Sequence, residues 1–334
     1  MNIITRKRIQ EPNSNFIQMH RNTRIDNHTL NLFKNIDYTK LHRYPVIDGF
    51  KEKYASFLGV NVNNILLTSG VDGAIRHMFE TLKEGDKILL LEPTYAMYRV
   101  YINLYNINVN TILPDSDTFT LNIDNLLEKT NDCKAVFIAN PNAPIETVLD
   151  VETINKIANL SDKIGFKLFI DEAYYGFGSP TSIDLINKHE NLYIARSFSK
   201  WFGLPSIRLG GIISNETRIN ELESSRLAYE TNTFSMLIAE TALENLKYFQ
   251  KYSEEINNSR LLIENKMHEL NIKTHGKLSN NILINHMLNL ESKNILLRKT
   301  IPYPAENWMS LTLGSMKMAD VFIQNFEILY NQKD

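Results

Sequence analysis

The feature that most constrains this chain is a series of short apolar runs separated by helix-like segments. The runs are rich in Leu, Ile, Val and Phe. They lack the strict alternation of apolar and polar residues that is expected of a sheet with one solvent-exposed face. Such runs are typical of strands buried on both faces, and their alternation with helices predicts an α/β fold with a mostly parallel sheet covered on both sides. The expected strands are 64–68, 87–91, 109–113, 134–139, 167–170, 191–195 and 209–214.

Helix signals lie between these strands. Asp48 to Leu58 suits a helix that ends at Gly59, because glycine readily adopts the left-handed conformation that closes a helix. Further helices are expected at 72–82, 96–105 and 151–164. Together, the strands and helices predict one large α/β domain.

The last third of the chain has a different pattern. It is mostly helical, with a long stretch at 234–270 and a closing helix at 318–331. Strand-like segments lie between these helices, at 281–285, 294–298 and 308–313. We therefore expect a large domain at 46–217, a smaller α+β domain at 218–334, and a polar arm at 1–45 that packs with the smaller domain.

Composition and charge exclude several classes of protein for this chain. The chain has 334 residues and a formal net charge of −2, which gives no electrostatic basis for binding nucleic acid or an anionic membrane. The single cysteine, Cys133, excludes an internal disulfide, and we predict no metal site. The basic start of the chain lacks an apolar run behind it, and no segment approaches the ~20 apolar residues of a spanning helix. We expect a cytoplasmic protein.

The stretch from 191 to 210 carries the strongest chemical signal. Lys200 follows a buried strand, where desolvation lowers the pKa of an amine and makes it a usable nucleophile. Ser197, Ser199 and Arg208 supply hydroxyls and a planar cation suited to a phosphate. Pyridoxal phosphate has both an aldehyde for the amine and a phosphate for these donors. The alternative is a strand-to-loop junction with a solvated lysine.

Other polar residues also follow strands. Asp171 ends the strand at 167–170, so its carboxylate needs a cationic or hydrogen-bonding partner, such as a protonated pyridine nitrogen, or its pKa rises. The alternative is that it caps the next element. Ser69-Gly70 precedes a helix and offers N–H groups to an anion, and Tyr95 could stack on a flat ring. Turns and packing often use such residues too.

The joint order of these motifs is more specific than any one of them. It resembles that of fold-type I pyridoxal-phosphate enzymes, class I/II aminotransferases, and is most similar to the histidinol-phosphate aminotransferase branch. The resemblance covers roughly residues 42 to 214. The motifs are Thr68-Ser69-Gly70, Glu92-Pro93-Thr94-Tyr95, Asn140-Pro141-Asn142-Ala143-Pro144, Asp171-Glu172-Ala173-Tyr174, and Ser197-Phe198-Ser199-Lys200 with Arg208.

The resemblance implies a role for each residue. Lys200 would bond the cofactor and move the proton, Asp171 would pair with the pyridine nitrogen, and Tyr174 would contact the ring oxygen. Tyr95 would stack on the ring, and Tyr44 would reach the phosphate across the interface of a homodimer with shared active sites. The other phosphate contacts would come from Ser197, Ser199, Arg208 and the amides of Ser69, Gly70 and Val71.

Three departures from the family pattern bear on the substrate. Ala143 replaces the asparagine that touches the ring oxygen, so Asn142 is predicted to make that contact, and Ile145-Glu146 replaces the Thr-Gly of the motif. Ser310 stands where the family has the arginine that grips the α-carboxylate. The segment 19–24 is arginine-rich rather than asparagine-rich. Serine cannot make a bidentate charged contact, so the predicted substrate residues are Arg21, Arg24 and Arg298, with Arg76 and Arg226 as further candidates.

We therefore predict a pyridoxal-phosphate-dependent aminotransferase that acts on a small, phosphorylated or otherwise anionic amine or ketone. Two further readings stay open. One is a decarboxylase of a phosphorylated amino acid, which would release CO2 without a keto-acid acceptor. The second is a non-catalytic relative that binds a ligand, which the retention of Lys200 and Asp171 disfavours.

Overall fold

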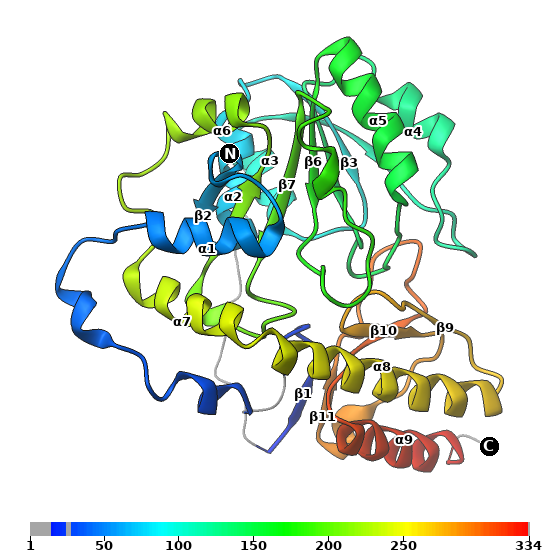
Figure 1. The fold of residues 1–334 in the computed structure, drawn as a ribbon. Coiled ribbons are helices and arrows are strands. Elements are labelled where there is room, and N and C mark those ends of the chain that lie inside the picture. The colour runs from blue at the N-terminus through cyan, green and yellow to red at the C-terminus, as the bar shows by residue number, and fades with distance from the viewer. Residues whose placement is uncertain (1–14, 25–27, 333–334) are drawn as a thin grey trace.

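In the computed structural model, which describes residues 15–24 and 28–332, a seven-stranded sheet forms the centre of the larger part of the molecule (Figure 1). Its strands are β2 (Ile65–Thr68), β3 (Lys87–Leu91), β4 (Asn108–Ile112), β5 (Ala135–Ala139), β6 (Lys167–Asp171), β7 (Leu192–Ser197) and β8 (Gly210–Ile213). The order is β2-β8-β7-β6-β5-β3-β4. In this sheet β8 runs opposite in direction to the other six strands, so the predicted mostly parallel α/β fold is confirmed.

Helices cover both faces of this sheet, as the apolar strands predict. Leu168 and Ile170 of β6 belong to one apolar cluster, which includes residues of α1 and α5, whereas Phe169 belongs to a second, which includes residues of α2 and α3. Successive strand residues point to opposite faces, so one strand feeds two cores. The helices are α1 (Asp48–Leu58), α2 (Gly70–Glu80), α3 (Met97–Leu104), α4 (Ile123–Lys129), α5 (Val151–Ile164), α6 (Glu216–Glu223) and α7 (Thr233–Glu244).

The C-terminal part packs against one end of this layered structure. The predicted helical stretch at 234–270 divides at Asn245 into α7 and α8 (Leu246–Glu269), and α9 (Met316–Tyr330) packs on α8. A three-stranded sheet has the order β12-β10-β9, and β1 pairs in parallel with β11. The strands are β1 (Ile17–Met19), β9 (Thr274–His275), β10 (Asn281–Ile284), β11 (Ile295–Leu297) and β12 (Met309–Thr312). The pattern did not predict α4, β1 or β9, and the domain boundaries stay a prediction.

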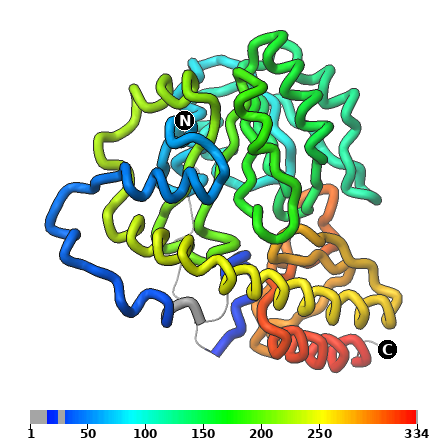
Figure 2. Tube along the Cα trace, viewed as in Figure 1, coloured from blue at the N-terminus to red at the C-terminus, as the bar shows by residue number. Residues whose placement is uncertain are grey.

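The segment before α1 loops out along one side of the molecule, where it contacts α7 (Figure 2). It contains two short 3-10 helices, His28–Phe33 and Tyr38–His42. Large apolar side chains are exposed along it, and Tyr44 stacks on Tyr229 with ring centroids 4.4 Å apart. An extended arm of this kind leaves apolar surface that a single chain does not cover.

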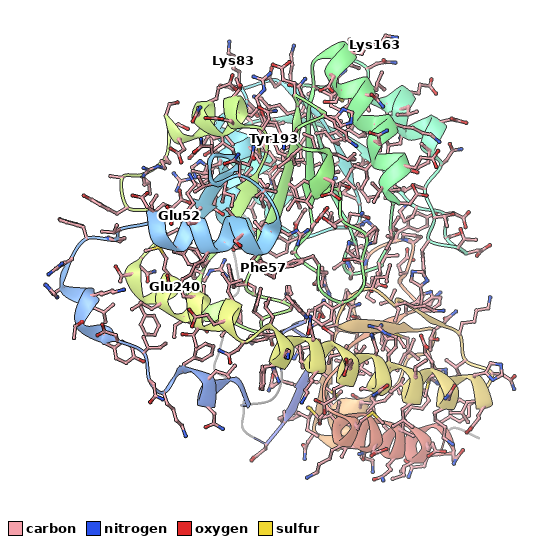
Figure 3. The ribbon with its side chains drawn as sticks, in the orientation of Figure 1. Glu52, Phe57, Lys83, Lys163, Tyr193 and Glu240 are labelled. Atoms are coloured by element: carbon pink, nitrogen blue, oxygen red, sulfur yellow. The ribbon has the colours of Figure 1, made fainter. Side chains whose placement is uncertain are left out.

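The interior and the surface separate clearly by residue type. Tyr193 of β7 lies within the sheet layer and is 1% exposed, whereas Lys83 and Lys163 point outward at the far end of the larger part (Figure 3). Among the described residues, no helix combines the length and apolar character needed to cross a membrane.

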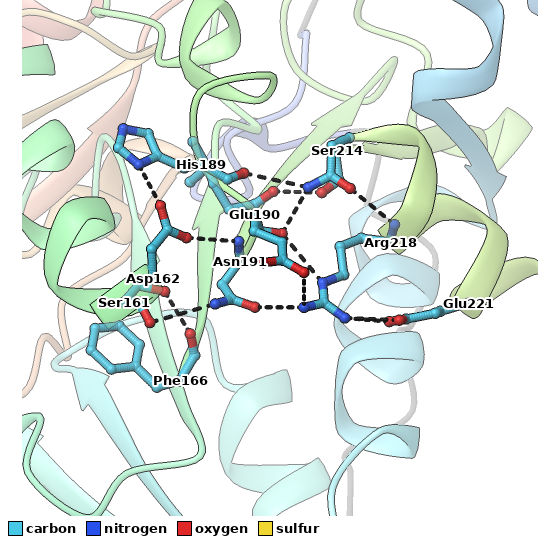
Figure 4. Close-up of polar contacts among 11 residues, drawn as sticks. Ser161, Asp162, Phe166, His189, Glu190, Asn191, Ser214, Arg218 and Glu221 are labelled. Atoms are coloured by element: carbon cyan, nitrogen blue, oxygen red, sulfur yellow. Dashed lines mark hydrogen bonds and ion pairs between the residues drawn. The ribbon is translucent and has the colours of Figure 1, made fainter. Parts of the chain in front are cut away.

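The amino-terminal end of β7 carries a dense polar network (Figure 4). His189 Nδ1 lies 2.8 Å from Asp162 Oδ2, and the other carboxylate oxygen accepts the Asn191 N–H at 3.1 Å. Arg218 donates to Asn191 Oδ1 and to Glu190 Oε1. This network ties the loop before β7 to α5 and α6, so it closes one edge of the sheet.

Candidate active site

The opposite edge of the sheet holds a cavity of about 350 Å³, where β5, β6 and β7 end. Ligand sites of parallel α/β sheets lie at this carboxyl edge, and the volume suits a small molecule. Ten of the predicted site residues line it: Arg21, Val71, Tyr95, Asp171, Tyr174, Ser197, Ser199, Lys200, Arg208 and Arg298. Their roles stay predictions, but the fold brings them to one place.

Lys200 enters this cavity from the turn that follows β7. The Ser199 N–H donates to Ser197 Oγ at 3.0 Å, which fixes the turn. Lys200 Nζ donates to the backbone carbonyl of Asn22 at 3.1 Å and lies 5.4 Å from the centroid of the Tyr174 ring. The amine is thus held by a neutral acceptor at the position where the sequence predicts an imine-forming group.

Asp171 is the last residue of β6 and is only 5% exposed. One carboxylate oxygen accepts the Ala173 N–H at 3.0 Å and the other accepts the Tyr98 hydroxyl at 3.2 Å. Burial raises the pKa of Asp171 to about 6, although both hydrogen bonds act to lower it. A cation beside the carboxylate would stabilise its charged form, and a protonated pyridine nitrogen is such a cation.

Tyr98 is a site residue that the sequence analysis missed. Its hydroxyl is fully buried beside Asp171, and burial is the main reason why the pKa of Tyr98 lies well above its usual value. The phenol therefore keeps its proton and acts as a donor to the carboxylate. In the sequence it is one tyrosine among several in a helix, so only the fold distinguishes it.

The predicted phosphate site lies at the start of α2. Arg208 has a left-handed backbone (φ 50°), and its Nη2 lies 2.9 Å from Asp72 Oδ2. A Cβ on Gly70 would come within 3.1 Å of the same nitrogen, and the backbone of Gly70 has a positive φ of 68°, so glycine suits this position. The Ser69 N–H donates to Glu230 at 3.2 Å, and Ser69 and Gly70 do not line the cavity. Arg208, with the serine hydroxyls beside it, is the better-placed anion donor.

These residues fit pyridoxal phosphate. The buried Asp171 carboxylate, with its raised pKa, suits the ring nitrogen, and Tyr174 suits the ring oxygen. Ser197, Ser199 and Arg208 offer donors for a phosphate in the same cavity. The donor set therefore matches each polar group of the cofactor.

Three further predicted residues lie outside the cavity. Asn142 is fully buried and donates to the Pro93 carbonyl at 2.8 Å, while Ala143 lines the cavity. Tyr44 lies on the arm and is 74% exposed. Arg24 points toward α8, where it donates to the Tyr248 hydroxyl at 3.0 Å. In this chain alone, none of the three lines the space beside Lys200.

Arg298 lies beside Ser310, the position at which the resemblance predicts that the family arginine is absent. The backbones of Arg298 and Ser310 form a bridge, with N–H to carbonyl distances of 3.2 and 2.9 Å. Ser310 is 3% exposed, whereas Arg298 lines the cavity. The neighbouring segment therefore supplies an arginine next to the serine.

Asn22 is a second residue that the sequence analysis missed. Its amide nitrogen donates to the Tyr174 hydroxyl at 2.9 Å and lies 3.2 Å from Asn281 Oδ1. Its amide oxygen accepts the Thr312 hydroxyl at 3.1 Å. The backbone is left-handed (φ 52°), which asparagine tolerates better than most residues. In the sequence, Asn22 lies between Arg21 and Arg24, whose charges were the signal that the sequence analysis used.

Comparison with known proteins identifies the family. Residues 21–324 match the family model for aminotransferase class I and II. The chain belongs to the aminotransferase class I and II family. Histidinol-phosphate aminotransferase of Sulfurisphaera tokodaii is 30% identical over 299 residues, which is 87% of this chain and 83% of that protein.

Solved structures agree on the fold. Histidinol-phosphate aminotransferase from Sinorhizobium meliloti, solved with pyridoxal-5'-phosphate, superposes with a TM-score of 0.84 at 16% identity, over 96% of this chain and 92% of that one. L-threonine-O-3-phosphate decarboxylase from Porphyromonas gingivalis gives 0.77 at 18% identity, over 94% and 99%. The predicted family branch, the class of a pyridoxal-phosphate-dependent aminotransferase, and the cofactor are confirmed.

Proposed function

We propose that this aminotransferase acts on a small amine or ketone that carries a phosphate or another anionic group. The observation that supports this proposal is that Arg298 lines the same cavity as Lys200, Asp171 and Tyr174. A guanidinium binds phosphate and carboxylate through two parallel hydrogen bonds, so an anionic end of the substrate would face Arg298 while its amine faces Lys200.

The residues divide the work between holding the cofactor and moving protons. Pyridoxal phosphate, when bound, supplies an electron sink for the negative charge that develops on the substrate carbon. Asp171 would hold the charge of the ring nitrogen, and Tyr174, oriented by Asn22, would donate to the ring oxygen. Lys200 Nζ would take the proton from the substrate α-carbon. It would hold that proton and return it later in the reaction.

Arg298 would take over part of the role lost at position 310. Ser310 is buried and cannot offer a charged fork, but its bridge partner Arg298 can. Arg21, from the segment that also supplies Asn22, lines the same cavity and adds positive charge near the substrate. Two arginines beside the substrate would favour a dianion such as a phosphate monoester.

A decarboxylase of a phosphorylated amino acid is the second candidate. Two points favour it: the resemblance to the family places Ser310 where the α-carboxylate arginine is expected, and the fold superposes on that of an L-threonine-O-3-phosphate decarboxylase. Release of CO2 without a keto-acid acceptor distinguishes this reaction from transamination.

We also propose a cytoplasmic homodimer with shared active sites. The exposed arm carries apolar side chains that a second copy would cover, and Tyr44 lies on it, away from the cavity of its own chain. In a dimer, Tyr44 would extend to the phosphate bound by the partner. The exposed apolar residues of the arm and of the segment beside it are Tyr38, Leu41, Tyr44, Val46, Leu227, Tyr229 and Phe234.

An absorbance spectrum of the purified protein with pyridoxal phosphate, before and after addition of amines, tests the proposed function. The amines are L-glutamate, histidinol phosphate, phosphoserine, phosphoethanolamine and serinol phosphate. We expect the visible band of the lysine-bound cofactor to convert with a phosphorylated amine and to be absent in Lys200→Ala. Conversion by an amine without an anionic group, as fast as by any of these anionic amines, would contradict the proposed anionic specificity.

A further inference from the structure

Glu146 occupies an unusual position in the loop that follows β5. The family motif has glycine there, and the backbone keeps the glycine-like left-handed conformation (φ 65°). A side chain in this conformation is disfavoured, and the carboxylate is also buried, at 5% exposure. A residue with two such costs is expected to make strong compensating contacts.

Those contacts go to one loop of the smaller sheet. The Glu146 carboxylate accepts the N–H groups of Lys277 and Leu278, the latter at 2.6 Å, and the hydroxyl of Ser279. Loop 276–281 comprises the connection between β9 and β10 together with the first residue of β10. Glu146 therefore connects the end of β5 in the large sheet to the three-stranded sheet, through three donors to one buried anion.

A buried arginine also binds this loop, through the loop's carbonyl groups. Arg260 of α8 donates to the carbonyls of Gly276 at 2.7 Å, Asn281 at 2.9 Å, and Ser279. The acid thus binds donors of the loop and the base binds its acceptors. The loop is fixed in position because several polar groups of its backbone face one of the two charges.

The loop leads directly to the cavity. Ser279 Oγ lies 2.9 Å from Asn281 Oδ1, which lies 3.2 Å from the Asn22 amide nitrogen. Asn22 in turn donates to the Tyr174 hydroxyl and accepts from Lys200 Nζ. Continuous hydrogen-bond distances therefore connect Glu146 to the two groups proposed to act on cofactor and substrate.

We propose that Glu146 is a positioning residue: it latches loop 276–281 to the end of β5 and so keeps Asn22, Tyr174 and Lys200 in their working arrangement. The latch itself follows from the contacts of the folded chain. Its effect on the reaction rests on the proposed function. Glu146, which stands in place of the motif glycine, then adds a contact between the two sheets.

Hydrogen exchange in the full-length, cofactor-loaded protein tests the latch. Glu146→Gly removes the carboxylate, and glycine adopts the left-handed backbone without strain. We expect the amides of Lys277 and Leu278 to exchange about tenfold faster or more, because they lose a buried acceptor. Glu146→Gln keeps an oxygen for both amides and should exchange more slowly than the glycine variant. Glu152→Gln, an exposed acid on α5, is the matched control and should match the wild type.

Kinetics and spectroscopy test the positioning role. In Glu146→Gly we expect kcat to fall about tenfold with little change in KM, and the pH midpoint of the visible cofactor band to shift, because Lys200 Nζ loses its fixed acceptor. Glu146→Gln should recover most of both. Ser279→Ala, which removes one donor and leaves the Glu146 backbone untouched, should produce a smaller change in the same direction and serves if the glycine variant does not fold.

The outcomes separate the two claims. Unchanged exchange at Lys277 and Leu278 in Glu146→Gly would overturn the latch. Faster exchange with unchanged kcat and an unshifted band would leave a merely structural contact and overturn the positioning role. If the wild type transaminates none of the amines tested, the proposed function fails, while exchange and the band midpoint still decide the inference.

Discussion

The two ends of β7 (Leu192–Ser197) carry similar residue types but differ in what these residues bind. At the amino end, Asp162, His189 and Arg218 pair with one another or with nearby polar groups (Figure 4). At the carboxyl end, Asp171 and Lys200 are held by neutral partners and face a cavity. The charges of Asp171 and Lys200 therefore remain available to a ligand, and Arg208 at the same end has a partly exposed pair with Asp72.

The pKa of Asp171 expresses this difference. Burial raises it to about 6, so keeping this carboxylate charged at neutral pH costs the folded chain stability. Asp162 lies in the last turn of α5, where a histidine and a backbone amide share its charge. An ionised group that lowers the stability of the cofactor-free protein indicates a functional site, because folding alone does not favour it.

The largest effect is expected at Lys200. Lys200→Ala should lower kcat by about 10³-fold or more, because the residue both bonds the cofactor and moves the proton. The measurement is single-turnover conversion of a substrate amine, with cofactor binding monitored separately. The matched control is Lys188→Ala, an exposed lysine near the amino end of β7, which should keep full activity. Comparable loss in both variants would erase the distinction between the two ends.

Asp171 predicts a pH dependence of stability for the cofactor-free protein. Its folded pKa of about 6 lies above the ordinary 3.8, so the folded state binds more protons between these values. Stability should therefore decrease as pH rises from about 4 to about 6, by about 3 kcal/mol from this group. Urea unfolding across this range, for wild type and for Asp171→Asn, isolates the contribution as a difference.

The same titration with pyridoxal phosphate bound sharpens the comparison. A cation beside Asp171 lowers its folded pKa, so the decrease in stability should disappear in the loaded wild type. Identical pH profiles for wild type and Asp171→Asn without cofactor would show that this carboxylate is not strained, and would contradict the contrast between the two ends.

Arg298 should control substrate affinity. Arg298→Ala is expected to raise KM for an anionic substrate about 10–100-fold with a smaller effect on kcat, because a hydrogen-bonded charge contact is lost. Initial rates with a phosphorylated amine, compared with those for an uncharged analogue, test this. Arg76→Ala removes an exposed arginine that pairs with Glu80 on α2 and is the control. Equal losses for charged and uncharged substrates would remove Arg298 from the substrate site.

The sequence predicted the sheet and much of the site because both depend on local patterns. Each strand is a continuous apolar run, and parallel strands deliver the residues that follow them to one edge. Lys200 and Asp171 could therefore be placed together without any structure. Arg208 could be added to them because it lies eight residues after Lys200 in the same stretch.

Contacts between distant parts of the chain were beyond the sequence. Asn22 meets Thr312 across 290 positions, and Glu146 meets Ser279 across 133. No periodicity records such pairs. Tyr98 was hidden for another reason: its role depends on which face of α3 meets the end of β6, and a helix rich in tyrosine presents several candidates. These contacts are determined by tertiary packing and not by local sequence pattern.

The smallest effect is expected at Arg218, at the amino end. Arg218→Ala should lower the free energy of unfolding by about 1 kcal/mol, because partly exposed charged hydrogen bonds contribute modestly. It should leave kcat and cofactor affinity unchanged. Arg208→Ala is the mirror variant: it should weaken cofactor binding about tenfold while changing the cofactor-free stability less, since its pair with Asp72 is largely solvent-exposed. Urea unfolding and cofactor titration on both variants give four values. If one end of β7 is structural and the other functional, Arg218→Ala loses stability but keeps cofactor affinity, and Arg208→Ala loses affinity with the smaller loss of stability. Any other pattern contradicts this division.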